Sequence, residues 1–370
     1  MESRQRRTTL LVAAGGGGDA LASLLVSRRL RNDGEIPIVA SYSWDRRILD
    51  PMPGPRSSAD FEVTQRLTPR NIEITAESRL YSGGLSTLRL LAEETSAQFI
   101  LLDPSNGALG MRQQLIELVE HFAFASVLLV DVGGDLIATG TEERLRSPLA
   151  DSLALATLAD FPVPVQVVIA GPGLDGELAP SYVRSRCLAV GGAFFGRLVA
   201  SDVEPYFPAL AQHPSEATTL LAAAAVGVTG RAEIRDNADV VSLDDGSADV
   251  YVLDASSAVA SNQIAKKLMT TRSMAEAEAA TVAICGRSEL DYERRKATIL
   301  VSAKPPTAEE MRDRLQNYWS SSTARGITLA TFRRLGEVMR LTSYDAKLIR
   351  ALAGAHADRR LALCWTSLSR

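Results

Sequence analysis

The chain has 370 residues, of which 46% are apolar, and its formal net charge is −4. This length and composition suffice for a large buried core, in about two domains or one large one. The negative charge disfavours a general nucleic-acid-binding protein, although residues 301–370 contain 12 Lys or Arg against 6 Asp or Glu. The cysteines are odd in number and widely spaced, which predicts neither a disulfide framework nor a structural zinc site and favours a reducing compartment.

The first residues do not have the pattern of a secretory signal. Arg4, Arg6 and Arg7 precede an apolar stretch at 8–14 that is too short, and a glycine run follows where a cleavage motif would belong. The sequence contains no run of about 18 apolar residues. We therefore expect a soluble, cytoplasmic protein without a membrane partner.

Apolar runs and helical patterns alternate along residues 8–170. Strands are predicted at 8–14, 36–41, 99–103, 127–130 and 165–170. Helices are predicted at 19–31, 86–95, 111–122 and 149–159. The segment 42–70 contains a proline-rich stretch that excludes helix there and predicts a long ordered loop. This alternation predicts an α/β fold with a doubly wound, mostly parallel, Rossmann-like sheet.

The alternation weakens beyond residue 180. Helices are predicted at 218–226 and 261–280, and strands at 249–254 and 297–301. Lys304-Pro305-Pro306 is the predicted boundary between an α/β domain, 1–303, and a basic helical C-terminal extension, 304–370. Its amphipathic helices, predicted at 308–319, 329–341 and 344–353, should pack on the body or on a second copy, and we expect a homo-oligomer. The arginines expected to stay solvated are Arg312, Arg333, Arg334 and Arg340.

Three glycine-acid loops follow apolar runs, at 15–19, 131–135 and 171–177. If those runs are parallel strands, their carboxyl ends share the sheet edge at which open α/β sheets bind ligands. The carboxylates then expected to converge on one crevice are Asp19, Asp131, Asp135 and Asp175.

Carboxylates gathered in this way suit a hard divalent cation. We predict Mg²⁺ or Mn²⁺ at Asp131, Asp135 and Asp175. The predicted catalytic residues are Asp135, Glu142 and Glu177, of which Glu142 or Glu177 would move a proton. The three histidines lie away from the glycine loops in sequence, which disfavours a His-rich zinc or iron site. The alternative for Asp19 and Asp151 is that they only cap helices.

The glycine loops also predict contacts to an anionic ligand, because backbone N–H groups can approach it closely there. Arginines near the proline-rich loop could bind phosphate or carboxylate, with a solvated loop anchored by Trp44 as the equal alternative. The predicted ligand-binding residues are Gly15, Gly16, Gly17, Gly18, Asp19, Trp44, Arg46, Arg56, Gly133, Gly134, Gly171 and Gly173. Gly15, Gly17 and Ala20 also satisfy a dinucleotide fingerprint, so NAD(P) or another nucleotide is the alternative cofactor, although Asp19 would repel a pyrophosphate.

Several blocks of the chain together resemble the signature of a known family. They are Gly15–Asp19, Trp44-Asp45-Arg46, Asp50–Arg56, Asp131–Asp135, Ser147–Asp151 and Gly171–Glu177, and they extend over roughly residues 10–255. Their order and content resemble the family called domain of unknown function 1152. The resemblance implies prokaryotic, cytosolic α/β proteins without an assigned reaction.

The sequence thus favours an enzyme that binds a divalent cation and a small polar substrate, such as a phosphorylated sugar or a nucleotide-like molecule. Hydrolase, lyase and transferase chemistry all fit. The alternatives are an enzyme dependent on a nucleotide cofactor, and a non-catalytic ligand-binding or partner protein that docks through its basic tail.

Overall fold

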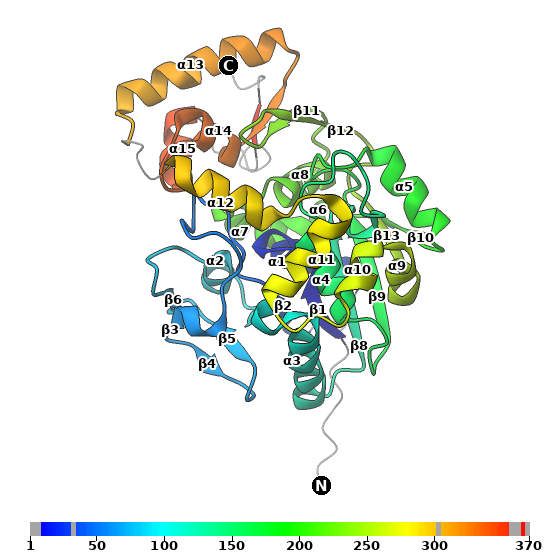
Figure 1. Ribbon diagram of the computed structural model, residues 1–370. Coiled ribbons are helices and arrows are strands. Elements are labelled where there is room, and N and C mark those ends of the chain that lie inside the picture. The colour runs from blue at the N-terminus through cyan, green and yellow to red at the C-terminus, as the bar shows by residue number, and fades with distance from the viewer. Residues whose placement is uncertain (1–8, 31–34, 301–304, 355–363, 367–370) are drawn as a thin grey trace.

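The computed structural model describes residues 9–30, 35–300, 305–354 and 364–366. Its centre is a nine-stranded sheet with the strand order β10-β13-β9-β8-β1-β2-β7-β5-β4 (Figure 1). The strands of its middle run parallel: β9 (Val165–Ala170), β8 (Ser126–Val132), β1 (Thr9–Ala13), β2 (Ile38–Ser41) and β7 (Gln98–Leu101). The predicted α/β fold with a large, mostly parallel sheet is confirmed.

Antiparallel strands complete the sheet at both sides. They are β13 (Asp249–Asp254) and β10 (Ala193–Arg197) beside β9, and β5 (Ile72–Ile74) and β4 (Gln65–Arg66) beside β7. The expected loop at 42–70 therefore contributes β4, and it also holds β3 (Phe61–Glu62), which pairs with β6 (Arg79–Leu80).

The central strands are buried on both faces. Along β1, Leu10 and Val12 pack on one side of the sheet, whereas Leu11 and Ala13 pack on the other, and all four are fully buried. The first face is covered by α3 (Gly107–Phe122), α4 (Pro148–Thr157), α9 (Ala255–Ser261), α10 (Gln263–Leu268) and α11 (Met274–Cys285). The second is covered by α1 (Gly17–Leu30), α2 (Thr87–Glu94), α6 (Ala200–Val203), α7 (Phe207–Gln212) and α8 (Glu216–Ala225), and α5 (Pro180–Ala189) lies near β10 and β13.

Three predicted elements beyond residue 250 were wrong in whole or in part. The helix expected at 329–341 begins only at residue 332, because residues 329–331 form a strand. The helix expected at 261–280 is broken into α9, α10 and α11, because Asn262 and Ser273 each begin a new helix by capping it with their side chains. The strand expected at 297–301 is wrong because residues 297–300 continue α12 (Glu289–Leu300); residue 301 lies outside the described residues.

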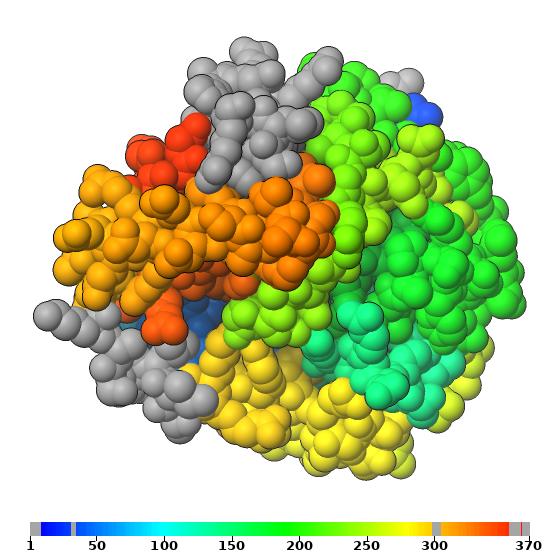
Figure 2. All heavy atoms as spheres, turned by 90° about the horizontal axis from the view of Figure 1, so that it is seen from above, coloured from blue at the N-terminus to red at the C-terminus, as the bar shows by residue number. Residues whose placement is uncertain are grey.

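A second, four-stranded sheet joins the C-terminal segment to an earlier part of the chain. Its order is β12 (Asp239–Leu243), β11 (Gly230–Ile234), β14 (Leu329–Thr331) and β15 (Cys364–Thr366). The parallel pair β11–β14 places Leu329 opposite Ala232. Around it lie α13 (Ala308–Ala324), α14 (Phe332–Met339) and α15 (Ala346–Ala353). Figure 2 shows α13, in orange, beside the yellow-green segment that contains β11.

The C-terminal helices have an apolar cluster of their own. It contains Met311, Leu315, Phe332, Leu335 and Met339. The expectation that the nearby arginines stay solvated was wrong for two of them. The side chains of Arg333 and Arg334 are only 13% and 12% exposed, because buried glutamates of α8 and β11 pair with them. No helix in the described part of the chain is long and apolar enough to cross a membrane.

Candidate functional site

A half-open cavity of about 170 Å³ lies where the parallel strands β1, β2 and β8 end. Its wall includes the glycine run Gly15–Gly18, the start of α4 and the start of α8. This is the sheet edge that the glycine-acid loops predict, since the carboxyl ends of parallel strands share one edge.

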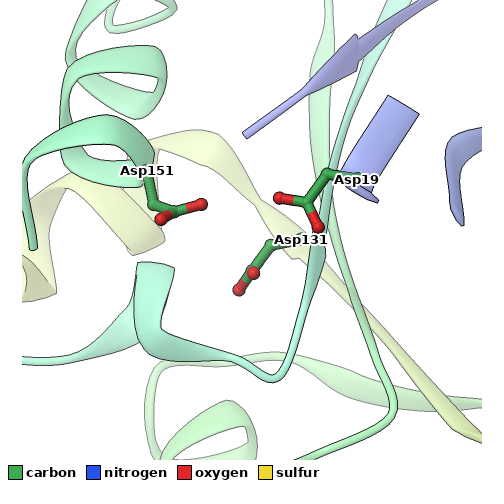
Figure 3. A group of neighbouring side chains, drawn as sticks. All are labelled: Asp19, Asp131 and Asp151. Atoms are coloured by element: carbon green, nitrogen blue, oxygen red, sulfur yellow. The ribbon is translucent and has the colours of Figure 1, made fainter. Parts of the chain in front are cut away.

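Three aspartates from separate elements meet in this cavity. Asp19 lies in the first turn of α1, Asp131 near the end of β8, and Asp151 in the first turn of α4. One carboxylate oxygen of each lies within 4.8 Å of the others. Figure 3 shows the three carboxylates pointing toward one another. We call these residues the aspartate triad.

Hydrogen bonds from the surrounding protein compensate only part of the negative charge of the triad. Asp19 accepts a hydrogen bond from the backbone N–H of Gly15 at 2.7 Å, and Asp131 accepts one from Leu136 at 3.3 Å through Oδ2. Oδ1 of Asp131 is buried and has no hydrogen-bond partner among the described residues. Burial raises the pKa of Asp19 to about 7, and burial together with neighbouring carboxylates raises the pKa of Asp131 and Asp151 well above the usual range.

A second acidic group, Asp135, Asp175 and Glu177, has carboxylate oxygens within 4.8 Å of one another. Burial raises the pKa of Asp175 to about 7, and burial and Asp151 raise that of Asp135. Glu177 is different. Its burial is outweighed by Arg235, whose Nη2 lies 2.9 Å from it, and by the Ser147 and Arg146 hydrogen bonds, so its pKa is lowered.

The cavity also contains residues that the sequence did not indicate. Glu289 of α12 accepts hydrogen bonds from the Leu149 and Ala150 amides at the start of α4, while its Oε2 has no partner among the described residues; burial raises its pKa to about 8. His213 is buried beside Gly17, and burial lowers its pKa to about 3. Arg235 and Arg333 line the same cavity.

A family model described as a protein of unknown function, DUF1152, matches residues 10–297. The chain belongs to the DUF1152 family. Comparisons with curated proteins and with solved structures found no match. The DUF1152 region includes the aspartate triad, the second acidic group and Glu289, and it ends before α13, so Arg333 lies beyond it.

Within the DUF1152 region, the first glycine loop lies at the cavity as predicted. Gly15, Gly16, Gly17 and Gly18 line it. Side chains are excluded here because other loops come close: a Cβ at Gly16 would lie 2.5 Å from the Trp44 carbonyl oxygen, and one at Gly17 would clash with Thr87. Trp44 lines the cavity, and its indole N–H donates to Glu293 at 3.0 Å.

The glycines of the other two DUF1152 loops do not line the cavity. Gly133, Gly134, Gly171 and Gly173 instead allow the loops after β8 and β9 to pack together. The N–H of Gly173 donates to the carbonyl of Gly133 at 2.7 Å.

Two predicted charged residues have partners outside the cavity. Glu142 accepts hydrogen bonds from Thr139, Gly140 and the Tyr182 hydroxyl, at 2.7, 3.0 and 2.6 Å. These bonds, Tyr182 first, outweigh its partial burial and lower its pKa to about 2. Arg56 forms a buried ion pair with Asp50, with Nε 2.6 Å from Oδ2, and so it holds the proline-rich loop in place.

Proposed function

We propose that this protein is an enzyme that binds a divalent cation, Mg²⁺ or Mn²⁺, at the aspartate triad and acts on a small polar substrate in the adjoining cavity. The observation that carries the proposal is the convergence of three carboxylates from α1, β8 and α4, with a buried Asp131 oxygen that has no partner among the described residues. A buried carboxylate without compensation is costly, and a cation would remove that cost.

This proposal changes the ion ligands expected from the sequence. Asp131 is retained, while Asp19 and Asp151 replace Asp135 and Asp175, which lie in the neighbouring acidic group. Carboxylate oxygens are the ligands that Mg²⁺ and Mn²⁺ prefer. Such an ion polarises a substrate oxygen or activates a bound water, which suits hydrolase, lyase or transferase chemistry. Asp135 and Asp175 line the cavity beside the triad, and in this proposal they move a proton.

The dinucleotide alternative is less well supported by the glycine loop. A pyrophosphate would need free N–H groups in the glycine run that leads into α1, but the Gly15 N–H already donates to the Asp19 carboxylate. Asp19 also faces the other two aspartates of the triad, so an anion placed there would meet negative charge from all three residues.

Thermal unfolding of the full chain with and without metal tests the proposal. Excess Mg²⁺ or Mn²⁺ should raise the Tm over that in EDTA; an ion at 100 times its Kd adds about 2.7 kcal/mol. Asp131→Asn should lose this response. In EDTA the same variant should unfold at a higher temperature than the wild type, because like-charge repulsion is reduced.

Asp245→Asn, at an exposed position outside the cavity, is the matched control and should keep the full metal response. An equal response of wild type and Asp131→Asn to both ions would exclude the triad as the ion site.

A further inference from the structure

Three arginines from separate segments line the cavity beside the acidic groups. Arg46 follows β2, Arg235 follows β11, and Arg333 lies in the first turn of α14. Arg333 is outside the DUF1152 region, so the C-terminal segment adds a charged residue to a cavity that is otherwise built from the family region.

Buried glutamates hold two of these side chains in place. Arg235 donates to Glu177 at 2.9 Å. Arg333 donates through Nε to Glu337 at 3.1 Å, and its Nη1 lies 3.4 Å from Glu216. A guanidinium has five N–H donors, so these pairs orient each arginine and leave donors for a ligand.

Glu216 connects the segments that carry Arg235 and Arg333. Its carboxylate accepts hydrogen bonds from the Arg235 backbone N–H at 3.1 Å and from the Thr331 hydroxyl at 2.7 Å. The start of α8, the turn after β11 and the start of α14 are therefore connected through a single buried carboxylate. This connection fixes Arg333 relative to Arg235 before any ligand binds.

Arg46 differs from the other two. Within the described ranges, no ion pair or hydrogen bond of its guanidinium is found, and its side chain is exposed at the cavity wall. The charges of Glu293 and Glu177 attract it and those of Arg333 and Arg235 repel it, none of them at ion-pair distance among the described residues, so its N–H donors remain available to a ligand. Arginine binds the oxygens of phosphate and carboxylate through parallel N–H bonds.

We propose that Arg46, Arg235 and Arg333 form a subsite for a phosphate group of the substrate, and that the C-terminal segment completes this subsite through Arg333. Three guanidinium groups suit the three terminal oxygens of a phosphate ester better than the two oxygens of a carboxylate. The inference rests on the proposed function, since the rest of the same substrate would meet the cation at the aspartate triad.

The test is the binding of inorganic phosphate and of malonate to the full chain by calorimetry, in EDTA and again in excess Mg²⁺. Phosphate should bind more tightly than malonate. Arg333→Met and Arg46→Met should each weaken phosphate binding roughly tenfold or more, the usual effect of losing a charge-assisted hydrogen bond.

Arg334→Met is the matched control. Arg334 is the next residue and is equally buried, but it pairs with Glu233 and does not line the cavity, so phosphate affinity should be unchanged. Arg46→Met leaves no ion-pair partner behind among the described residues, so it reports on the subsite even if Arg333→Met destabilises the fold.

The subsite is excluded if phosphate does not bind in either condition, if Arg46→Met binds it like the wild type, or if malonate binds as tightly. If Asp131→Asn abolishes the metal response but the arginine variants bind phosphate like the wild type, the phosphate subsite is wrong and the ion site stands. Arginine-dependent phosphate binding without any metal response would overturn the ion site alone.

Discussion

Asp175 occupies the space in which a side chain at Gly133 would lie. A Cβ at Gly133 would be 2.4 Å from Cγ of Asp175, and Gly133 has a φ of +116°. The loops after β8 and β9 can therefore approach each other only if residue 133 has no side chain. The position of Asp175 in the second acidic group depends on this contact.

Gly133→Ala should accordingly destabilise the protein by more than the backbone strain alone, which is about 1–3 kcal/mol. The control is Gly191→Ala, which also has a positive φ, +85°, but no atom within 4 Å of the added Cβ. Urea unfolding of both variants measures the difference. Equal losses in the two variants would show that the contact with Asp175 contributes nothing.

Without a metal ion, stability should fall as the pH rises between about 6.5 and 8. The folded pKa values of Asp19, Asp175 and Glu289, about 7, 7 and 8, lie above those of unfolded carboxylates, about 4. The folded state then holds more protons than the unfolded state, so deprotonation disfavours folding. Excess Mg²⁺ should reverse the trend, because it binds the ionised form. A Tm in EDTA that rises over this range would contradict the prediction.

The titration of His213 should change stability in the opposite direction, and at lower pH. Burial lowers its pKa to about 3, whereas an unfolded histidine titrates near 6.5. The contribution of neutral His213 to the free energy of unfolding is complete above about pH 6.5. It is lost as the pH falls, by up to roughly 1.4 kcal/mol per pH unit. His213→Asn keeps an acceptor for the Ser215 N–H and should remove this loss. The Tm difference from the wild type, followed from neutral to acidic pH, measures this loss, with His121→Asn at an exposed position of α3 as the control.

Arg56→Met should cost stability without changing ligand binding. The substitution leaves the Asp50 carboxylate buried without its ion pair, which costs about 3–5 kcal/mol. Metal and phosphate affinities, measured on the folded fraction, should match those of the wild type, because Arg56 lies outside the cavity lining. Arg66→Met, at an exposed position, is the control for a lost arginine. A weaker phosphate affinity in Arg56→Met would show that Arg56 contributes to ligand binding after all.

The sheet could be predicted because its strands are short apolar runs separated by amphipathic helices. The strand 165–170 was predicted to the residue. The prediction of a strand at 297–301 was wrong because the apolar and β-branched residues at 297–300 end the helix α12 rather than begin a strand. A few apolar residues at a helix end have the same local pattern as a buried strand.

The carboxylates could be predicted for the same reason, since Asp131 lies near the end of a strand and Asp135 in the loop that follows it. Asp151 could also be identified in the sequence, but an aspartate that caps a helix and an aspartate that binds an ion have the same sequence pattern. His213, Arg235 and Arg333 had no local signal. The positions of Arg235 and Arg333 depend on β11 and β14, whose pairing brings residues 232 and 329 together, and His213 lies between α7 and α8. Glu142 lies near an acidic loop in sequence, but the Thr139 and Tyr182 hydrogen bonds hold it in a turn outside the cavity.

The parallel pairing of β14 with β11 has a consequence for the order of folding during synthesis. The three aspartates of the triad lie within the first 151 residues, so they leave the ribosome well before α14 does. Until β14 arrives, β11 is an edge strand with unpaired backbone groups on one side, and pairing it closes the loop between residues 232 and 329. A nascent chain would therefore acquire the two acidic groups first and Arg333, the last arginine of the cavity, later in translation. The proposed ion ligands would thus be synthesised before the last residue of the proposed phosphate subsite.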